Sequence, residues 1–141
     1  MPSKIVLNAD LPVCSALRSW VGNNNELLQG FDLLVAEDVL EGMSQGGSLD
    51  HLAVTSTRAI AEGGDIELAA TILQGDVSGL IHFPAPGAER AGDVLSEPLL
   101  RAALLNNLPI ALNPATASAL VRGIKGSRRG YLIFNPVAGQ G

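Results

Sequence analysis

The chain has 141 residues, a mass of 14.6 kDa and a formal net charge of −5 at pH 7. This length suits one compact domain that buries its own core without disulfides or a structural metal. Hydrophobic residues make up 47% of the chain and charged residues 16%, the composition of a soluble globular domain. No apolar run approaches the roughly 20 residues that span a bilayer, and the N-terminus lacks the basic start and apolar core of a signal peptide. We therefore expect a cytoplasmic domain with no membrane partner.

The charges are distributed unevenly along the chain. Every acidic residue lies at or before Glu97, whereas the last third holds a basic set, Arg101, Arg122, Lys125, Arg128 and Arg129. An acidic body disfavours nucleic acid as a partner. The single cysteine, Cys14, excludes an internal disulfide and is predicted to be a small buried residue, because neither histidine is near it in sequence.

The hydrophobic pattern predicts strands that alternate with helices. The elements expected in chain order are a strand at 4–8, a helix from Asp10 to Val21, a strand at 31–36, a short helix at 39–43, a strand at 52–55, a helix at 65–73, a strand at 79–83, a helix at 95–106, a strand at 109–112 and a helix from Asn113-Pro114 to Val121. Asp10 and Asn113 are placed to cap the helices that follow them. In the helix at 95–106, the residues expected to face the core are Leu99, Leu100, Ala103 and Leu104.

This alternation predicts a three-layer α/β/α fold with a five-stranded, mostly parallel sheet covered on both faces. Ligands of such sheets sit beyond the carboxyl ends of the strands. The polar residues expected at those ends are Asn8, Asp10, Glu37, Asp38, Thr55, Ser56, Thr57 and Asn113. Thr55 to Thr57 offer hydroxyl groups and no charge.

Gly63-Gly64-Asp65 forms a glycine loop before a helix, and two roles are open for the carboxylate. Asp65 either caps the helix, which is worth roughly 1 kcal/mol, or faces a ligand as a general base. His82 lies inside a strand and is either a core or interface residue or a catalytic acid. Glu37, Asp38 and Asp10 all lie at strand ends and could together bind a divalent ion. Because the sequence gives no further sign of such a site, we expect no metal and no cofactor.

The composition changes after Val121. Residues 122–130 predict a basic, glycine-rich linker, and residues 131–134 then predict a new strand that runs into the turn Asn135-Pro136. We therefore expect one domain over 1–121 and the start of a second, truncated domain over 131–141.

The sequence over about residues 3–121 resembles methylglyoxal synthase. The resemblance rests on the order and spacing of several segments, Gly63-Gly64-Asp65, Gly75-Asp76, Leu99-Leu100-Arg101, 107–111 and Asn113-Pro114-Ala115-Thr116-Ala117. It implies a five-stranded parallel sheet, assembly as a homo-oligomer, usually a hexamer, and a small-molecule ligand. The same domain type binds effectors in carbamoyl phosphate synthetase and also occurs in the bifunctional purine enzyme. If active, the domain would be a carbon-oxygen lyase that eliminates phosphate from dihydroxyacetone phosphate.

The resemblance assigns residues to that chemistry, which needs a carboxylate base, a histidine and a nest for the phosphate. It places Asp65 on the family's catalytic base and Asp10 on an active-site aspartate, and the ligand-binding residues carried with them are Gly63, Gly64, Thr55, Ser56, Thr57 and Asn113. The positions expected to help them differ here. At the catalytic positions, Gly92 stands where the family has a histidine, and Ala85 and Leu95 stand where it has aspartates. At the phosphate site, Glu37-Asp38 replaces a Thr- and Gly-rich turn. Residues 11–13 also replace a lysine, and residues 59–61 replace Ser-Gly-Pro.

Residues 131–141 resemble the first strand and Asn-Pro-x-x-Gly turn of diacylglycerol-kinase-type lipid kinases. The hypothesis from sequence is therefore a methylglyoxal synthase-like domain with degraded phosphate and catalytic sites, acting as a regulatory or oligomerising module of a lipid kinase. The alternative is an active synthase in which Asp65 is the base and His82 the acid. A third possibility is an assembly domain that binds no ligand.

Overall fold

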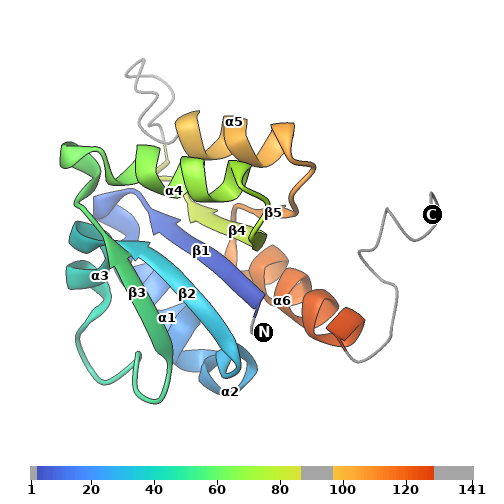
Figure 1. Ribbon diagram of the computed structural model, residues 1–141. Coiled ribbons are helices and arrows are strands. Elements are labelled where there is room, and N and C mark those ends of the chain that lie inside the picture. The colour runs from blue at the N-terminus through green and yellow to red at the C-terminus, as the bar shows by residue number, and fades with distance from the viewer. Residues whose placement is uncertain (1–2, 87–96, 129–141) are drawn as a thin grey trace.

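Five parallel strands form one sheet in the order β3-β2-β1-β4-β5 (Figure 1). The structure is a computed structural model and describes residues 3–86 and 97–128. The strands are β1 (Ser3–Ala9), β2 (Phe31–Ala36), β3 (Ala53–Thr57), β4 (Val77–Phe83) and β5 (Ile110–Ala111). The helices are α1 (Cys14–Asn23), α2 (Asn25–Leu28), α3 (Glu37–Met43), α4 (Gly64–Leu73), α5 (Glu97–Leu105) and α6 (Pro114–Arg128), with short 3-10 turns η1 (Leu11–Val13) and η2 (Ile60–Glu62). The predicted α/β fold with a five-stranded parallel sheet is confirmed.

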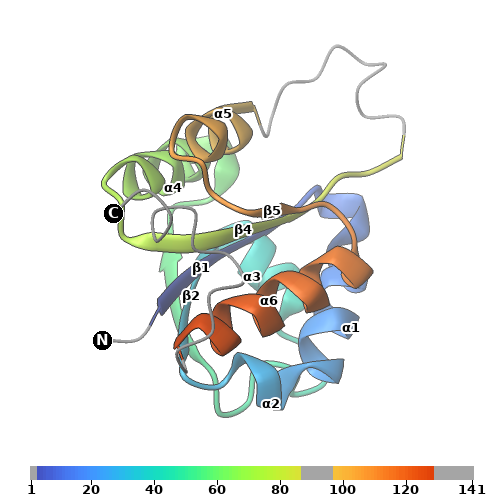
Figure 2. The ribbon, with the colours of Figure 1, turned by 90° about the vertical axis from the view of Figure 1, so that its right-hand side faces the viewer.

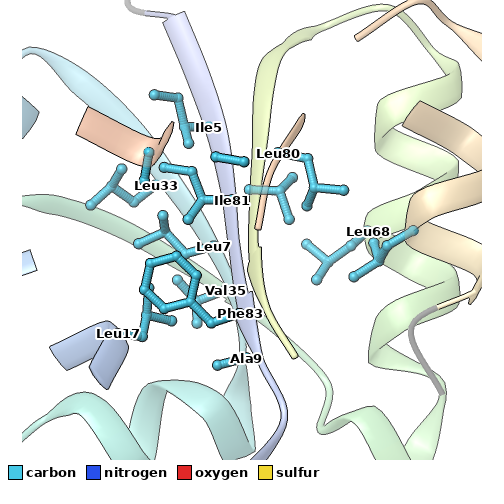
Figure 3. Close-up of a cluster of buried hydrophobic side chains, with 14 of the residues drawn as sticks. Ile5, Leu7, Ala9, Leu17, Leu33, Val35, Leu68, Leu80, Ile81 and Phe83 are labelled. Carbon is cyan, nitrogen blue, oxygen red and sulfur yellow. The ribbon is translucent and has the colours of Figure 1, made fainter. Parts of the chain in front are cut away.

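Helices cover both faces of the sheet. Helices α4 and α5 lie together on one face, and α1, α2, α3 and α6 lie on the other (Figure 2). Both faces are needed because the central strands are apolar on each side: β1 buries Ile5, Val6 and Leu7 completely. Figure 3 shows Leu17 of α1 beside Leu7 and Phe83 on one face, and Leu68 of α4 near Leu80 on the other.

Aromatic and polar contacts join α1 to the sheet and to α6 on the face opposite α4 and α5. The ring of Trp20 meets Phe83 edge to face, with centroids 6.4 Å apart. The indole Nε1–H of Trp20 donates to Ser118 Oγ at 3.0 Å, which ties α1 to α6. These contacts hold the carboxyl end of β4 against α1, beside the expected ligand edge.

The predicted linker at 122–130 is wrong over the residues that the structure describes. Helix α6 continues past Val121 to Arg128, and Ile124 on it is buried. The methyl groups of Leu120 and Ile124 pack so closely on Gly79 of β4 that a Cβ there would lie 2.9 Å and 3.2 Å from them. Helix α6 therefore packs against the sheet beyond Val121, where the first domain was expected to end.

Two smaller predictions also need correction. Leu104 was expected to face the core, but it is 73% exposed, and Ala102 of α5 is buried in addition to Ala103, which was predicted correctly. The third strand begins at Ala53 and ends at Thr57, slightly later than expected. The predicted strand at 131–134, the turn at Asn135-Pro136 and the positions of Gly92 and Leu95 lie outside the described residues.

No helix within residues 3–86 and 97–128 is long and apolar enough to cross a membrane.

Candidate ligand site at the carboxyl ends of the strands

The order of the strands places the topological switch point of the sheet between β1 and β4. The chain builds β1, β2 and β3 outward in one direction and then returns to add β4 and β5 on the other side of β1. The connections leave β1 and β4 in opposite directions, so their carboxyl ends form the topological switch point, where open parallel sheets bind ligands. The polar residues at those two ends are Asn8, Asp10 and His82.

Asp10 joins the two sides of the switch point. Its Oδ2 accepts a hydrogen bond of 2.7 Å from the backbone N–H of Ala85, just after β4. Its own N–H donates to the carbonyl of Phe83 at 3.0 Å. The prediction that the Asp10 side chain caps the following helix is wrong. Asp10 occupies the position before η1, but its side chain makes no capping hydrogen bond. The carboxylate fixes the start of the loop after β4.

Asn8 and His82 form a buried polar pair one step before the ends of their strands. They are register partners in β1 and β4, and their side chains are 4% and 1% exposed. Asn8 Nδ2 lies 3.1 Å from His82 Nδ1. Burial lowers the pKa of His82, and the charge of Asp10 opposes this effect more weakly. His82 is therefore buried, as the alternative of a core or interface residue predicts, and Asn8, which was expected at the carboxyl end of the first strand, had been given no role there.

The glycine pair before α4 has a structural reason. Gly63 is the N-cap and has φ of 95°, the left-handed region that favours glycine. At Gly64 a Cβ would lie 1.9 Å from the carbonyl oxygen of Arg58, so a side chain has no room. Asp65 follows inside the first helical turn, so the first of its two predicted roles, that of the cap, is wrong. Its Oδ1 accepts from the adjacent N–H of Ile66 at 2.9 Å.

Asp38 and Glu37 occupy the turn after β2. Asp38 Oδ1 accepts backbone N–H groups from Val39 at 3.0 Å and from Ile60 at 3.1 Å, so it binds η2 to the start of α3. Cys14 is buried nearby, and its pKa is raised by burial and further by the charges of Asp38 and Asp10. The described part of the chain contains no group of three or more His, Cys, Asp or Glu residues arranged to hold a metal ion.

The remaining predicted ligand residues lie on opposite edges of the sheet. Thr55, Ser56 and Thr57 belong to the edge strand β3, and the Oγ1 of Thr57 donates to the Arg58 carbonyl. Asn113 follows β5 at the other edge, where its Oδ1 accepts from Thr116 N–H at 2.9 Å and caps α6 as predicted. Four strand spacings separate β3 from β5, or about 19 Å at about 4.8 Å each. One small ligand cannot contact both sets.

The residues directly after the strands carry an acidic balance. Asp10, Glu37 and Asp38 are the carboxylates at these positions in the described chain, and Arg58 is the cation. The Arg58 guanidinium lies 3.7 Å from Glu67, whose Oε1 also accepts from Arg58 N–H at 3.2 Å. The strand ends therefore offer hydrogen-bond donors and acceptors to a ligand, and the cation there, Arg58, is already paired with Glu67.

The chain was compared with known proteins. No known protein-family model matches it. An uncharacterized protein of Synechocystis sp. is 32% identical over 145 residues, which is all of this chain and 32% of the relative, so the chain spans about a third of that relative's length. The methylglyoxal synthase of Rhizobium rhizogenes is 33% identical over 110 residues, covering 76% of this chain and 83% of that protein. The methylglyoxal synthase of Rhizobium meliloti is 42% identical over 86 residues, covering 59% of this chain and 68% of that protein.

The comparison of structures gives the same fold. The crystal structure of methylglyoxal synthase from Elizabethkingia anophelis superposes with a TM-score of 0.72 over 85% of this chain and 77% of that chain, at 22% identity. Sequence similarity over most of the length of a curated synthase, together with this fold, shows that the chain belongs to the methylglyoxal synthase family.

Proposed function

We propose that this chain is a methylglyoxal synthase-family domain that has lost efficient catalysis and serves as a regulatory or oligomerising module of a longer protein, a lipid kinase. The observation that carries the proposal is the charge at the carboxyl ends of the strands. Asp10, Glu37 and Asp38 follow β1 and β2, while the cation after β3, Arg58, is paired with Glu67.

A phosphate-bearing substrate is disfavoured by this charge balance. A carboxylate about 5 Å from a phosphate dianion repels it by several kcal/mol at an effective dielectric near 20, before solvent screening is counted. Asp38 and Asp10 also have oxygens engaged by backbone N–H groups of Ile60 and Ala85, which gives both carboxylates a structural role.

The longer protein is supported by the comparison with Synechocystis. All of this chain aligns with 32% of that relative, so most of the relative lies outside the match. The resemblance of residues 131–141 to the start of diacylglycerol-kinase-type lipid kinases supplies the class of the second domain. We place the synthase-like module over residues 1–128, since α6 reaches Arg128.

The oligomerising role is supported by exposed apolar side chains on the face of α4 and α5. Ile66 and Leu73 of α4 are 64% and 52% exposed, and Leu104 and Leu105 of α5 are 73% and 66% exposed. Apolar side chains gathered on one face are typical of an interface between subunits. A homo-oligomer, with a hexamer as the state implied by the family resemblance, is the assembly proposed.

The loss of catalysis is tested by incubating the chain with dihydroxyacetone phosphate and measuring methylglyoxal. The synthase of Rhizobium rhizogenes, assayed in parallel, is the positive control. We expect no production above the buffer rate. Robust turnover that Asp65→Asn abolishes would contradict the proposal.

The kinase assignment needs the full-length protein. With ATP and vesicles containing diacylglycerol, we expect phosphorylated lipid, and we expect removal of residues 1–128 to change the rate or the assembly state. A full-length protein that phosphorylates no lipid would show that the assignment of the second domain is wrong.

The second candidate is an active synthase in which Asp65 is the base and His82 the acid. One observation favours it: the Nε2 of His82 has no hydrogen-bond partner in the described chain, although the ring is buried. This candidate requires phosphate to bind at the strand ends. A thermal-shift titration with inorganic phosphate that gives no stabilisation would exclude it.

A further inference from the structure

The pair of Asn8 and His82 is incompletely hydrogen-bonded where ligands of this fold bind. The amide of Asn8 donates from Nδ2 to His82 Nδ1, so the neutral imidazole carries its proton on Nε2. Asn8 Oδ1 and His82 Nε2 then have no partner within the described residues. Buried polar atoms without partners cost about 1–3 kcal/mol each, so a native pair of them calls for a role.

The location of the pair gives it that role. Asn8 and His82 lie on the two strands that form the switch point, one residue before Ala9 and Phe83 end those strands. The neighbouring carboxylate, Asp10, bridges the same two strands through Ala85. Asn8 and His82 therefore lie in contact at the switch point, close enough to Asp10 for its charge to act on the imidazole, and the other side chains buried in the described chain are apolar.

We infer that Asn8 and His82 recognise a small, uncharged, hydroxyl-bearing molecule without phosphate at the β1–β4 switch point. A single hydroxyl or hydroxy-carbonyl group accepts from Nε2–H and donates to Oδ1, which satisfies both atoms. Asp10 and the acidic turn after β2 disfavour an anion at the same place. The inference rests on the proposed loss of the phosphate site.

Burial also determines how such a ligand binds. Because the unpartnered atoms are out of contact with solvent, the ligand reaches them only when the strand-end region opens locally. Hydrogen bonds made there are stronger than at the surface, because the ligand groups and the pair are both removed from water. We expect slow association and a strong preference for ligands that offer both a donor and an acceptor.

The test uses dihydroxyacetone as the probe and the histidine resonances as the readout. The chain has two histidines, and His51 lies exposed in a turn, so it serves as an internal control in the same spectrum. In a long-range 15N spectrum we expect His82 in the Nε2–H tautomer and expect its ring nitrogens to shift with dihydroxyacetone while His51 does not. Equal shifts of both rings, or none for His82, would overturn the inference.

A double variant separates recognition from packing. Asn8→Leu with His82→Phe replaces both polar groups by apolar ones of similar size, and such paired replacements are nearly neutral or stabilising. We expect dihydroxyacetone affinity, measured by calorimetry, to fall at least about tenfold, since two hydrogen bonds are lost. Unchanged affinity in a folded double variant would overturn the inference, and the wild-type spectrum decides the matter if the variant does not fold.

The phosphate ester distinguishes this inference from the proposed function. We expect dihydroxyacetone phosphate to bind no more tightly than dihydroxyacetone and to yield no methylglyoxal. Methylglyoxal formation while His82 still responds to dihydroxyacetone would contradict the proposed function and leave recognition by Asn8 and His82 standing, whereas tighter binding of the ester with no response of His82 would contradict the recognition site.

Discussion

At the residue scale, Gly63 and Gly64 are adjacent but are required for different reasons. Gly63 has φ of 95° with open space around its Cα, so an alanine there strains the backbone by about 1–2 kcal/mol. Gly64 is limited by the Arg58 carbonyl oxygen, 1.9 Å from the place of a Cβ. Both glycines were predicted to bind ligand, and their conformations account for them without one.

The first prediction compares alanine at these two positions. Gly64→Ala is expected to lower the free energy of unfolding by about 3 kcal/mol or more, because the clash is with backbone that cannot move aside cheaply. Gly63→Ala serves as the matched variant and is expected to lose about 1–2 kcal/mol. Urea unfolding measures both. Equal losses would show that the carbonyl oxygen of Arg58 does not lie this close to Gly64 at the start of α4.

The second prediction concerns the pH dependence given by His82. Its pKa in the folded chain lies below the ordinary value of 6.5, so the folded chain holds that proton more weakly than the unfolded chain does. The stability contributed by the neutral imidazole is complete above pH 6.5 and is lost as the pH falls below it, with a slope of up to about 1.4 kcal/mol per pH unit.

Urea unfolding between pH 7.5 and pH 5 measures this slope, in a range where most exposed carboxylates are still ionised. His82→Phe is expected to flatten the profile. The control is His51→Gln, which changes an exposed histidine and should leave the profile as in the wild type. A wild-type profile that is flat over this range would contradict the burial of His82.

At the scale of elements, the alternation of apolar runs and caps predicted the five strands and the helices between them. The cap of α6 was predicted correctly because Asn113 carries its signal locally, in the bond from Thr116 N–H to its side chain. Leu104 and the end of α6 were predicted incorrectly for a different reason. Which face of α5 is buried depends on its fit against neighbouring elements, and the structure packs Ala102 and Ala103 inward while leaving Leu104 exposed.

The extension of α6 shows the same limit. Residues 122–128 contain three positions with weak helix preference, Gly123, Gly126 and Ser127, and local propensity predicts a linker. Tertiary packing decides otherwise, because Leu120 and Ile124 fit against the bare backbone of Gly79. The sequence contains both halves of this contact, but they are far apart along the chain.

The third prediction tests this helix. Ile124→Ala is expected to lower the free energy of unfolding by about 2–4 kcal/mol, because it opens a cavity between α6 and β4. Arg122→Ala, an exposed position on the same helix, is expected to change it by less than about 0.5 kcal/mol. Thermal and urea unfolding measure both variants. A neutral Ile124→Ala would restore the linker interpretation.

At the scale of the whole molecule, the candidate site was only partly predictable. Family resemblance suggested Asp10 and Asp65 as candidates, and the strand ends suggested the acidic turn at Glu37 and Asp38. The sheet order could not be derived from these segments, so Thr55 to Thr57 and Asn113 were grouped although they lie at opposite edges. Because the order of the strands was not known from the sequence, the pairing of Asn8 with His82 could not be predicted either. The two residues are neighbours only because β4 lies beside β1.

The fourth prediction concerns where the net charge of −5 acts. Glu37 is exposed directly after β2, at the carboxyl ends of the strands where a ligand is expected. Glu26 is exposed on α2, which precedes β2 at the amino ends of the strands. Glu37→Gln and Glu26→Gln raise the net charge by the same single unit. If repulsion at the strand ends excludes phosphate, only Glu37→Gln strengthens phosphate binding, by about twofold to fivefold at low ionic strength.

Calorimetric titration with inorganic phosphate in 20 mM and 500 mM salt measures the effect. The gain from Glu37→Gln is expected to shrink at high salt, because an exposed charge is screened within about 10 Å already near 0.1 M. An equal gain from Glu26→Gln would mean that total charge, and not its position, governs the exclusion of anions. A wild-type domain that already binds phosphate tightly would favour the active synthase, because the acidic strand ends would then not prevent substrate binding.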